Sequence, residues 1–145
     1  MTSPTLPFGT AMALAERNLR GPLVRILAEE ELEAGAWFTV NALGLRGAAP
    51  RAVLKQLLST NGYDDANAEA LLSRLATDAL VENSEGGLRL TPIGRERFDS
   101  ISGRIRDVTR RIFGLFDPTR VETTRALLQQ IAEVDPATID RVAFE

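Results

Sequence analysis

The chain has 145 residues, of which 44% are hydrophobic and 26% charged, and its formal net charge is −3. This composition is typical of one globular domain, and no apolar run is long enough to cross a membrane, so we expect a cytoplasmic protein with no membrane partner. Cysteine is absent and the histidine count is zero. The sequence thus excludes disulfides, thiol and imidazole catalysis and the usual zinc ligands, and it predicts no cofactor, no metal site and no enzymatic activity.

The first fifty residues have the pattern of two helices with an acidic segment between them. Gly21 and Pro22 interrupt the first, so Pro22 either kinks this helix or begins a shorter one. The acidic run from Glu29 to Glu33 predicts a solvated helix face or a loop. We expect Gly44 and Gly47 to close the second, short helix. The apolar or small residues that mark the two helices are Met12, Ala15, Leu19, Leu23, Ile26, Trp37, Val40 and Leu43.

The next segment has the pattern of a helix-turn-helix. Pro50 suits the first turn of a helix, and Asp64 is placed to cap a second helix after the loop at residues 59–62. Apolar residues expected to face the core recur in both helices at Val53, Leu54, Leu57, Leu58, Ala68, Leu71, Leu72 and Leu75. Two short helices joined by a tight turn that contains glycine are a candidate DNA-binding unit.

A β-hairpin is expected after these helices. The runs 80–82 and 88–90 flank a polar tip whose glycines allow the positive φ of a tight turn. Thr91 and Pro92 then supply the N-cap and the first residue of another helix.

The C-terminal third predicts helices that have more apolar surface than one small core requires. The first carries an a/d seam of steps of three and four residues, at Phe98, Ile101, Ile105, Val108, Ile112 and Leu115. Asp117-Pro118 and Asp135-Pro136 each end one helix and start the next. Homodimerisation is the simplest way to bury these faces.

Three motifs occur in order within residues 62–98. They are Leu-Leu-x-Arg-Leu at 71–75, Leu-Val-Glu at 80–82 and Leu-Thr-Pro-x-Gly-Arg at 90–95. In this order and spacing the segment resembles the recognition helix, wing and following helix of the MarR family of regulators. The pattern of helices before and after it fits the same family, so the resemblance covers nearly the whole chain.

This resemblance implies a mainly α fold, a winged helix-turn-helix with a small β-hairpin wing and long N- and C-terminal dimerisation helices, in one domain over residues 1–145. About 1–34 and 98–145 would be the dimerisation helices and about 35–97 the winged helix-turn-helix. The implied function is that of a homodimeric transcriptional regulator that binds double-stranded DNA, with the recognition helix in the major groove and the wing in the minor groove.

The predicted recognition helix is acidic. Residues 61–82 contain one basic and five acidic residues, a net charge of −4, and residues 46–97 balance seven basic against seven acidic residues. Asp65 or Glu69 could accept a hydrogen bond from cytosine N4, or Asp64 and Asp65 serve only to stabilise the helix N-terminus. We expect DNA binding to be weak or salt-sensitive. The candidate DNA-binding residues are Arg51, Asp65, Asn67, Glu69, Ser73, Arg74, Arg89 and Arg95.

Family members often bind a small phenolic or anionic effector, and such a ligand could contact Trp37 and Phe38 while Arg17 or Arg20 pairs with its charge. Aromatic residues at helical spacing are otherwise core residues. Because the recognition helix is acidic, the alternative hypothesis is a MarR-fold dimer that has lost DNA binding and serves as a ligand-binding or protein-interaction module. An enzyme on the same scaffold is the third hypothesis, since a fold does not fix a function.

Overall fold

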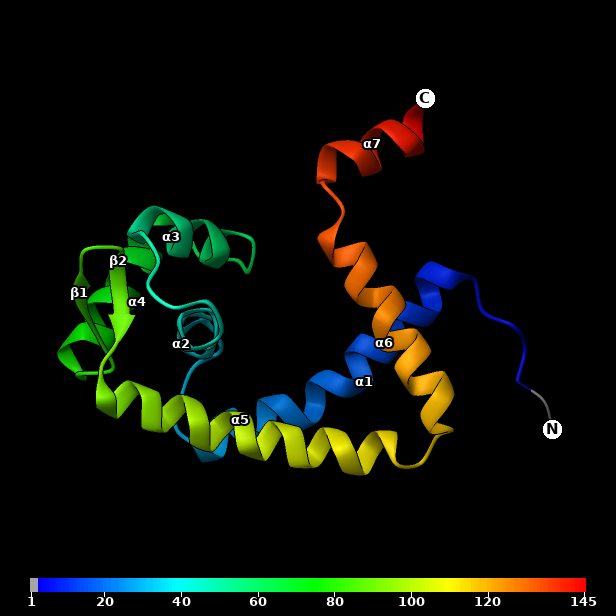
Figure 1. Ribbon diagram of the computed structural model, residues 1–145, viewed down its shortest axis with the longest axis horizontal. Coiled ribbons are helices and arrows are strands. Elements are labelled where there is room, and N and C mark those ends of the chain that lie inside the picture. The colour runs from blue at the N-terminus through cyan, green and yellow to red at the C-terminus, as the bar shows by residue number, and fades with distance from the viewer. Residues whose placement is uncertain (1–2) are drawn as a thin grey trace. The chain divides into compact units, whose positions relative to one another are not determined.

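The computed structural model describes residues 3–145, which form seven helices and one two-stranded antiparallel hairpin (Figure 1). This is the mainly α architecture that the sequence predicts. The chain divides into a first compact unit that ends at Arg106 and a second unit, Asp107–Glu145. The elements are α1 (Phe8–Glu29), α2 (Ala34–Arg46), α3 (Arg51–Ser59), α4 (Asp65–Thr77), β1 (Val81–Ser84), β2 (Gly87–Leu90), α5 (Pro92–Phe113), α6 (Pro118–Glu133) and α7 (Pro136–Phe144).

The core of the first unit lies between α2, α3, α4 and the hairpin, which are grouped together at one end of α5 (Figure 1). The inward stripe predicted for α4 is confirmed, because its members are at most 2% exposed: Ala68, Leu71, Leu72 and Leu75. In α3 only Leu54 and Leu58 are buried, whereas Val53 is 53% exposed. The prediction for Val53 was wrong because a nine-residue helix turns only a narrow i, i+4 face toward its neighbours.

The N-cap of α4 forms as the sequence predicts. The Asp64 side chain accepts a hydrogen bond from the backbone N–H of Asn67 at 2.8 Å. This bond satisfies one of the donors that the first turn of a helix leaves without an intrahelical partner. The cap fixes where α4 begins and therefore which side chains lie on its exposed face.

The hairpin is joined to the loop that precedes α3. Strands β1 and β2 pair in register from Val81 opposite Leu90 to Ser84 opposite Gly87. Leu88 also forms a bridge with Ala49, with N–H to oxygen distances of 3.0 and 2.8 Å. Gly87 adopts φ +114° beside the carbonyl of Ala49, where a Cβ would overlap that oxygen.

Helix α1 continues through Pro22, so this proline does not begin a shorter helix, which was one of the two expectations for it. The acidic segment lies at the end of α1 and in the loop that follows, as predicted, and two of its carboxylates are in addition paired. Glu29 and Glu30 form ion pairs with Arg104 of α5, the second at 2.8 Å. Arg104 therefore compensates two adjacent carboxylates, that of Glu29 at the end of α1 and that of Glu30 directly after it.

Of the two glycines predicted to close α2, one does so and the other has a different role. Gly47, at φ +84°, closes the helix, but Gly44 lies inside it. A Cβ at Gly44 would overlap the ring of Phe98, so this glycine allows α5 to approach α2 closely. The predicted cap of α5 is present, because the Thr91 hydroxyl accepts a hydrogen bond from the N–H of Gly94 at 2.9 Å.

The second unit contains the end of α5, then α6 and α7. Helices α6 and α7 begin at Pro118 and Pro136, as predicted. Asp117 and Asp135 cap them, accepting hydrogen bonds from backbone N–H groups at 3.0 and 2.9 Å. The seam predicted to reach Leu115 is shorter in the structure, because α5 ends at Phe113. Neither α6 nor α7 has a buried residue. Within residues 3–145, no helix has the length and apolarity that crossing a membrane would require.

An apolar groove of about 620 Å³ lies in this second unit, at the end of α5 and along α6. Its apolar lining includes Phe113, Phe116, Val121 and Leu128, and Arg110, Arg120 and Arg125 also line it. Outside the groove, α6 and α7 carry further exposed apolar side chains at Leu127, Ile131, Ile139, Val142 and Phe144.

Candidate nucleic-acid interface

Helices α3 and α4 form the predicted helix-turn-helix, with Gly62 at φ +92° in the turn between them. Since the apolar stripe of α4 is buried, its opposite face is open to solvent. That face carries small or acidic side chains, and Arg74 is the only basic residue in the helix. The exposed or half-exposed residues on this side are Asp65, Ala66, Glu69, Ala70 and Ser73.

Two basic residues of α3 pair with two carboxylates of α4, and we call these four residues the α3–α4 ion-pair cluster. Arg51 Nη2 lies 2.6 Å from Glu69 Oε2. Lys55 Nζ lies 3.0 Å from Glu69 Oε1 and 2.7 Å from Asp65 Oδ1. Both oxygens of Glu69 therefore contact a cation, and the cluster as a whole has no formal charge.

The cluster changes the proton affinity of its members. The hydrogen bond from Arg51, and then that from Lys55, lowers the pKa of the Glu69 carboxyl below its ordinary value. Hydrogen bonds to Asp65 and Glu69 raise the pKa of the Lys55 ammonium. Both shifts favour the charged forms of Glu69 and Lys55.

A second polar contact ties α4 to the start of α2. Arg74 pairs with Glu33, and the Tyr63 hydroxyl donates to Glu33 Oε2 at 3.0 Å and accepts from the N–H of Gly35 at 3.1 Å. Burial, and then the hydrogen bond to Glu33, raises the pKa of Tyr63, so its hydroxyl remains a donor. A small polar pocket of about 220 Å³ lies here, and Asn67 contributes to its lining.

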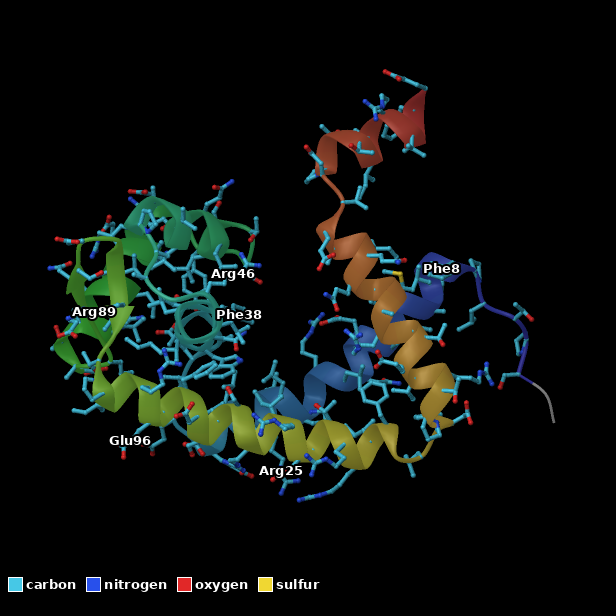
Figure 2. The ribbon with its side chains drawn as sticks, in the orientation of Figure 1. Phe8, Arg25, Phe38, Arg46, Arg89 and Glu96 are labelled. Atoms are coloured by element: carbon cyan, nitrogen blue, oxygen red, sulfur yellow. The ribbon has the colours of Figure 1, made fainter. Side chains whose placement is uncertain are left out.

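Arg89 of the hairpin and Arg95 of α5 also form contacts within the chain. Arg89 of β2 lies on the hairpin (Figure 2), where its Nε donates to Glu82 of β1 at 3.1 Å. Arg95 donates to the carbonyl oxygen of Gly44 at 3.2 Å, and its guanidinium lies 5.4 Å from the centroid of the Phe98 ring. Arg95 therefore contacts α2 through this hydrogen bond and Phe98 of its own helix through a cation–π contact.

The structure brings three of the predicted DNA-binding residues together, since Arg51, Asp65 and Glu69 all belong to the α3–α4 ion-pair cluster. Asn67 and Arg74 border the polar pocket instead, and Ser73 is exposed on α4. Sequence reasoning did not select Lys55 as a site residue. Its position four residues after Arg51 places both cations on one face of α3, which is the signal that could have identified it.

The residues predicted to hold an effector have different environments. Trp37 is 5% exposed and stacks on Phe98 with ring centroids 6.2 Å apart, so it is a core residue of the first unit. Phe38 on α2 is half-buried and Arg17 on α1 is exposed; Figure 2 labels the position of Phe38. Neither the apolar groove nor the polar pocket is lined by any of the three.

Comparison with solved structures establishes the fold. The Mycobacterium tuberculosis MarR family protein Rv2887, solved in complex with DNA, matches with a TM-score of 0.73 and 16% identity, covering 88% of this chain and 98% of the other. NadR in complex with 4-hydroxyphenylacetate matches with a TM-score of 0.75 and 17% identity, covering 91% and 99%. This chain has the MarR fold. The likeness predicted from the motifs in residues 62–98 is therefore confirmed for the fold.

A third protein with the MarR fold is BpsR of Bordetella bronchiseptica, whose DNA binding is regulated by 6-hydroxynicotinic acid. It matches with a TM-score of 0.66 and 19% identity, covering 92% of this chain and all of BpsR. No protein-family model matches the sequence, and no curated protein shows significant sequence similarity to it. The likeness therefore lies in the arrangement of elements rather than in shared side chains.

Proposed function

We propose that this protein is a homodimeric, DNA-binding transcriptional regulator whose affinity for its site is altered by a small effector. The observation that carries the proposal is the α3–turn–α4 unit with its adjoining hairpin in a MarR fold, which the DNA-bound Rv2887 shares. In such a unit the second helix lies in the major groove and the first crosses the DNA backbone. This is a binding role rather than a catalytic one.

We propose further that DNA binding is sensitive to salt and modest in strength. Each basic side chain of α3, α4 and the hairpin, namely Arg51, Lys55, Arg74 and Arg89, already pairs with a carboxylate of the same chain. Phosphates must compete with these carboxylates, so fewer counterions are released than the number of basic residues would indicate.

Dimerisation is supported by the apolar surface of the terminal helices. In α1 the exposed apolar residues include Phe8, Met12 and Val24, and α6 exposes Leu127 and Leu128 beside the apolar groove. Exposed apolar surface of this extent is typical of an interface between subunits. We propose that residues of about 1–34 and 98–145 form the dimer interface, and that about 35–97 bind DNA.

Two of the proteins with this fold point to the chemistry of the effector. NadR was solved in complex with 4-hydroxyphenylacetate, and the DNA binding of BpsR is regulated by 6-hydroxynicotinic acid. We propose an effector of the same chemistry, a small aromatic anion, for this protein. Arg17 and Phe38 stay candidate contacts, whereas Trp37 would act through the core that it shares with Phe98.

The alternative function is a MarR-fold dimer that does not bind DNA and instead binds a ligand or another protein. One observation favours it, because the exposed face of α4 is acidic and the neighbouring cations of α3 are neutralised within the chain. Such a surface has no net attraction for phosphate.

Selection from genomic DNA tests the proposal against this alternative. The purified protein would be incubated at low salt with sheared genomic DNA of its source organism, and the bound fragments sequenced. Enrichment of a few sites that share a palindrome supports the regulator. No enrichment above input at low salt contradicts DNA binding by the unliganded protein and favours the interaction module.

A further inference from the structure

The α3–α4 ion-pair cluster holds one carboxylate in a defined position on the exposed face of α4. Glu69 is the fifth residue of the helix, and each of its oxygens contacts a different cation, Arg51 on one side and Lys55 on the other. Its side chain is 41% exposed. Glu69 is therefore positioned by two contacts and is still accessible from outside.

The residues around Glu69 would let this face approach a duplex closely. Ala66 and Ala70 lie beside it on the helix and are exposed, so no long side chain separates the backbone of α4 from a groove. The first turns of a recognition helix are the part that contacts base edges. In this part of α4 the charged side chains are carboxylates, which can only accept hydrogen bonds.

The two cations reduce the electrostatic repulsion that a carboxylate would otherwise experience at a DNA surface. An uncompensated Glu69 would be repelled by the phosphates, but the cluster has no formal charge. A carboxylate has about four acceptor positions, and the two cations occupy only part of them. Arg51 and Lys55 each have more N–H donors than the carboxylates of the cluster occupy.

The chemistry of the base edges then selects one base. In the major groove cytosine presents the N4 amino group as a donor, and guanine and thymine present acceptors that repel a carboxylate. Adenine presents N6 as a donor but has the acceptor N7 beside it, so a group that only accepts fits adenine less well.

We propose that Glu69 is the base-reading side chain of α4 and that it selects cytosine through the N4 amino group. This inference rests on the proposed function. It assigns the specificity of the site to one residue and gives the ion pairs with Arg51 and Lys55 a purpose, which is to present a carboxylate to DNA without net charge.

The test is selection from a random-sequence duplex library at low salt, with the wild-type protein, Glu69→Gln and the control Asp78→Asn. Asp78 is the C-cap of α4, exposed and at the opposite end of the helix from the cluster. The wild type and the control should select sequences with a cytosine at one fixed position. Glu69→Gln should lose that cytosine and favour adenine there, because glutamine can bond both N6 and N7 of adenine.

Competition binding measures how strongly the protein discriminates between the bases at that position. The wild type should bind the selected site about tenfold or more tightly than a site in which that cytosine is replaced by thymine, whereas for Glu69→Gln the ratio should fall to roughly threefold or less. Replacing the cytosine by pyrimidin-2-one, which lacks the amino group, should weaken the wild type to a similar extent. This arm leaves the protein unchanged and so does not depend on how the variant folds.

The possible failures are distinguishable. If the wild type enriches no sequence, the proposed function fails and this inference fails with it. If the wild type selects a site without a fixed cytosine, or if Glu69→Gln keeps the same cytosine with the same ratio, only the inference is overturned. Full affinity for the pyrimidin-2-one site would also overturn it.

Discussion

At the scale of single residues, the pairing of Glu69 has a consequence for stability that can be measured without DNA. Because Arg51 and Lys55 lower the pKa of its carboxyl in the folded state, ionised Glu69 stabilises the fold at pH values above the ordinary glutamate pKa of 4.5. This stabilisation is lost as the pH falls through the lowered pKa. Glutamine at this position has no such dependence.

We therefore expect the difference in unfolding free energy between wild type and Glu69→Gln to be constant above roughly pH 5.5 and to shrink as the pH is lowered further. Urea denaturation of both proteins from pH 3 to 7 measures it. The other carboxylates are common to both proteins, so their contributions cancel in the difference. A difference that stays the same at every pH would show that the ion pairs do not stabilise the folded state.

Two glycines offer a matched pair for testing how closely the elements pack. A Cβ at Gly44 in α2 would overlap the Phe98 ring, whereas a Cβ at Gly103 in α5 would have no atom within 4 Å. We expect Gly44→Ala to lower the unfolding free energy by about 1–3 kcal/mol, because Phe98 and Trp37 must shift.

Gly103→Ala should instead leave the unfolding free energy unchanged or raise it by up to about 1 kcal/mol, since alanine has a higher helix propensity than glycine. Thermal or urea unfolding of the two variants measures whether each substitution lowers or raises the unfolding free energy. Equal effects at the two positions would contradict the close approach of α5 to α2 at Gly44.

At the scale of elements, the start of α4 depends on one cap. Asp64→Ala removes the acceptor for the N–H of Asn67 and should cost about 1 kcal/mol in unfolding free energy. Asp64→Asn is the control, because asparagine caps helices nearly as well. Equilibrium unfolding in urea compares the two, and a loss as large for Asn as for Ala would mean that the cap does not act through its side-chain acceptor.

The elements of the fold were largely predictable from the sequence, because each has a local signal. The apolar spacing of α4, the capping residues Asp64, Asp117 and Asp135, and the glycine-containing tip of the hairpin all act within a few residues. The errors lie where the signal is not local. Gly44 reads as a helix terminator in sequence, but the Phe98 ring decides its role from 54 positions away.

The candidate site was less predictable for the same reason. Arg51 and Glu69 were both selected as DNA-binding residues, but the sequence does not show that they contact each other across two helices. The charge count of residues 46–97 correctly indicates that few cations are available, yet it cannot say which carboxylate neutralises which cation. That information comes only from the packing of α3 against α4.

At the scale of the whole molecule, the exposed apolar face of α6 predicts an effect on assembly. Leu128→Glu combined with Ile131→Glu should give a protein with the mass of one chain in sedimentation equilibrium, whereas the wild type should have twice that mass. These residues are 45% and 39% exposed, so the folded chain itself does not require them to be apolar.

Gln130→Glu is the control, because it adds a glutamate at an exposed position of the same helix that is already polar. It should leave the mass unchanged. A double variant that keeps the mass of the wild type, or a wild type that is itself a monomer, would contradict dimerisation through this face.

The bridge between Ala49 and Leu88 means that the hairpin does not move independently of the helix-turn-helix. Backbone hydrogen bonds of 2.8 and 3.0 Å attach β2 to the loop that leads directly into α3, so we expect a displacement of the hairpin to shift the first turn of that helix, and Arg51 with it. On DNA, the width of the minor groove under the wing and the bases under α4 would then be sensed jointly. Base changes beneath the wing would alter the discrimination made by α4, although no side chain of α4 touches them.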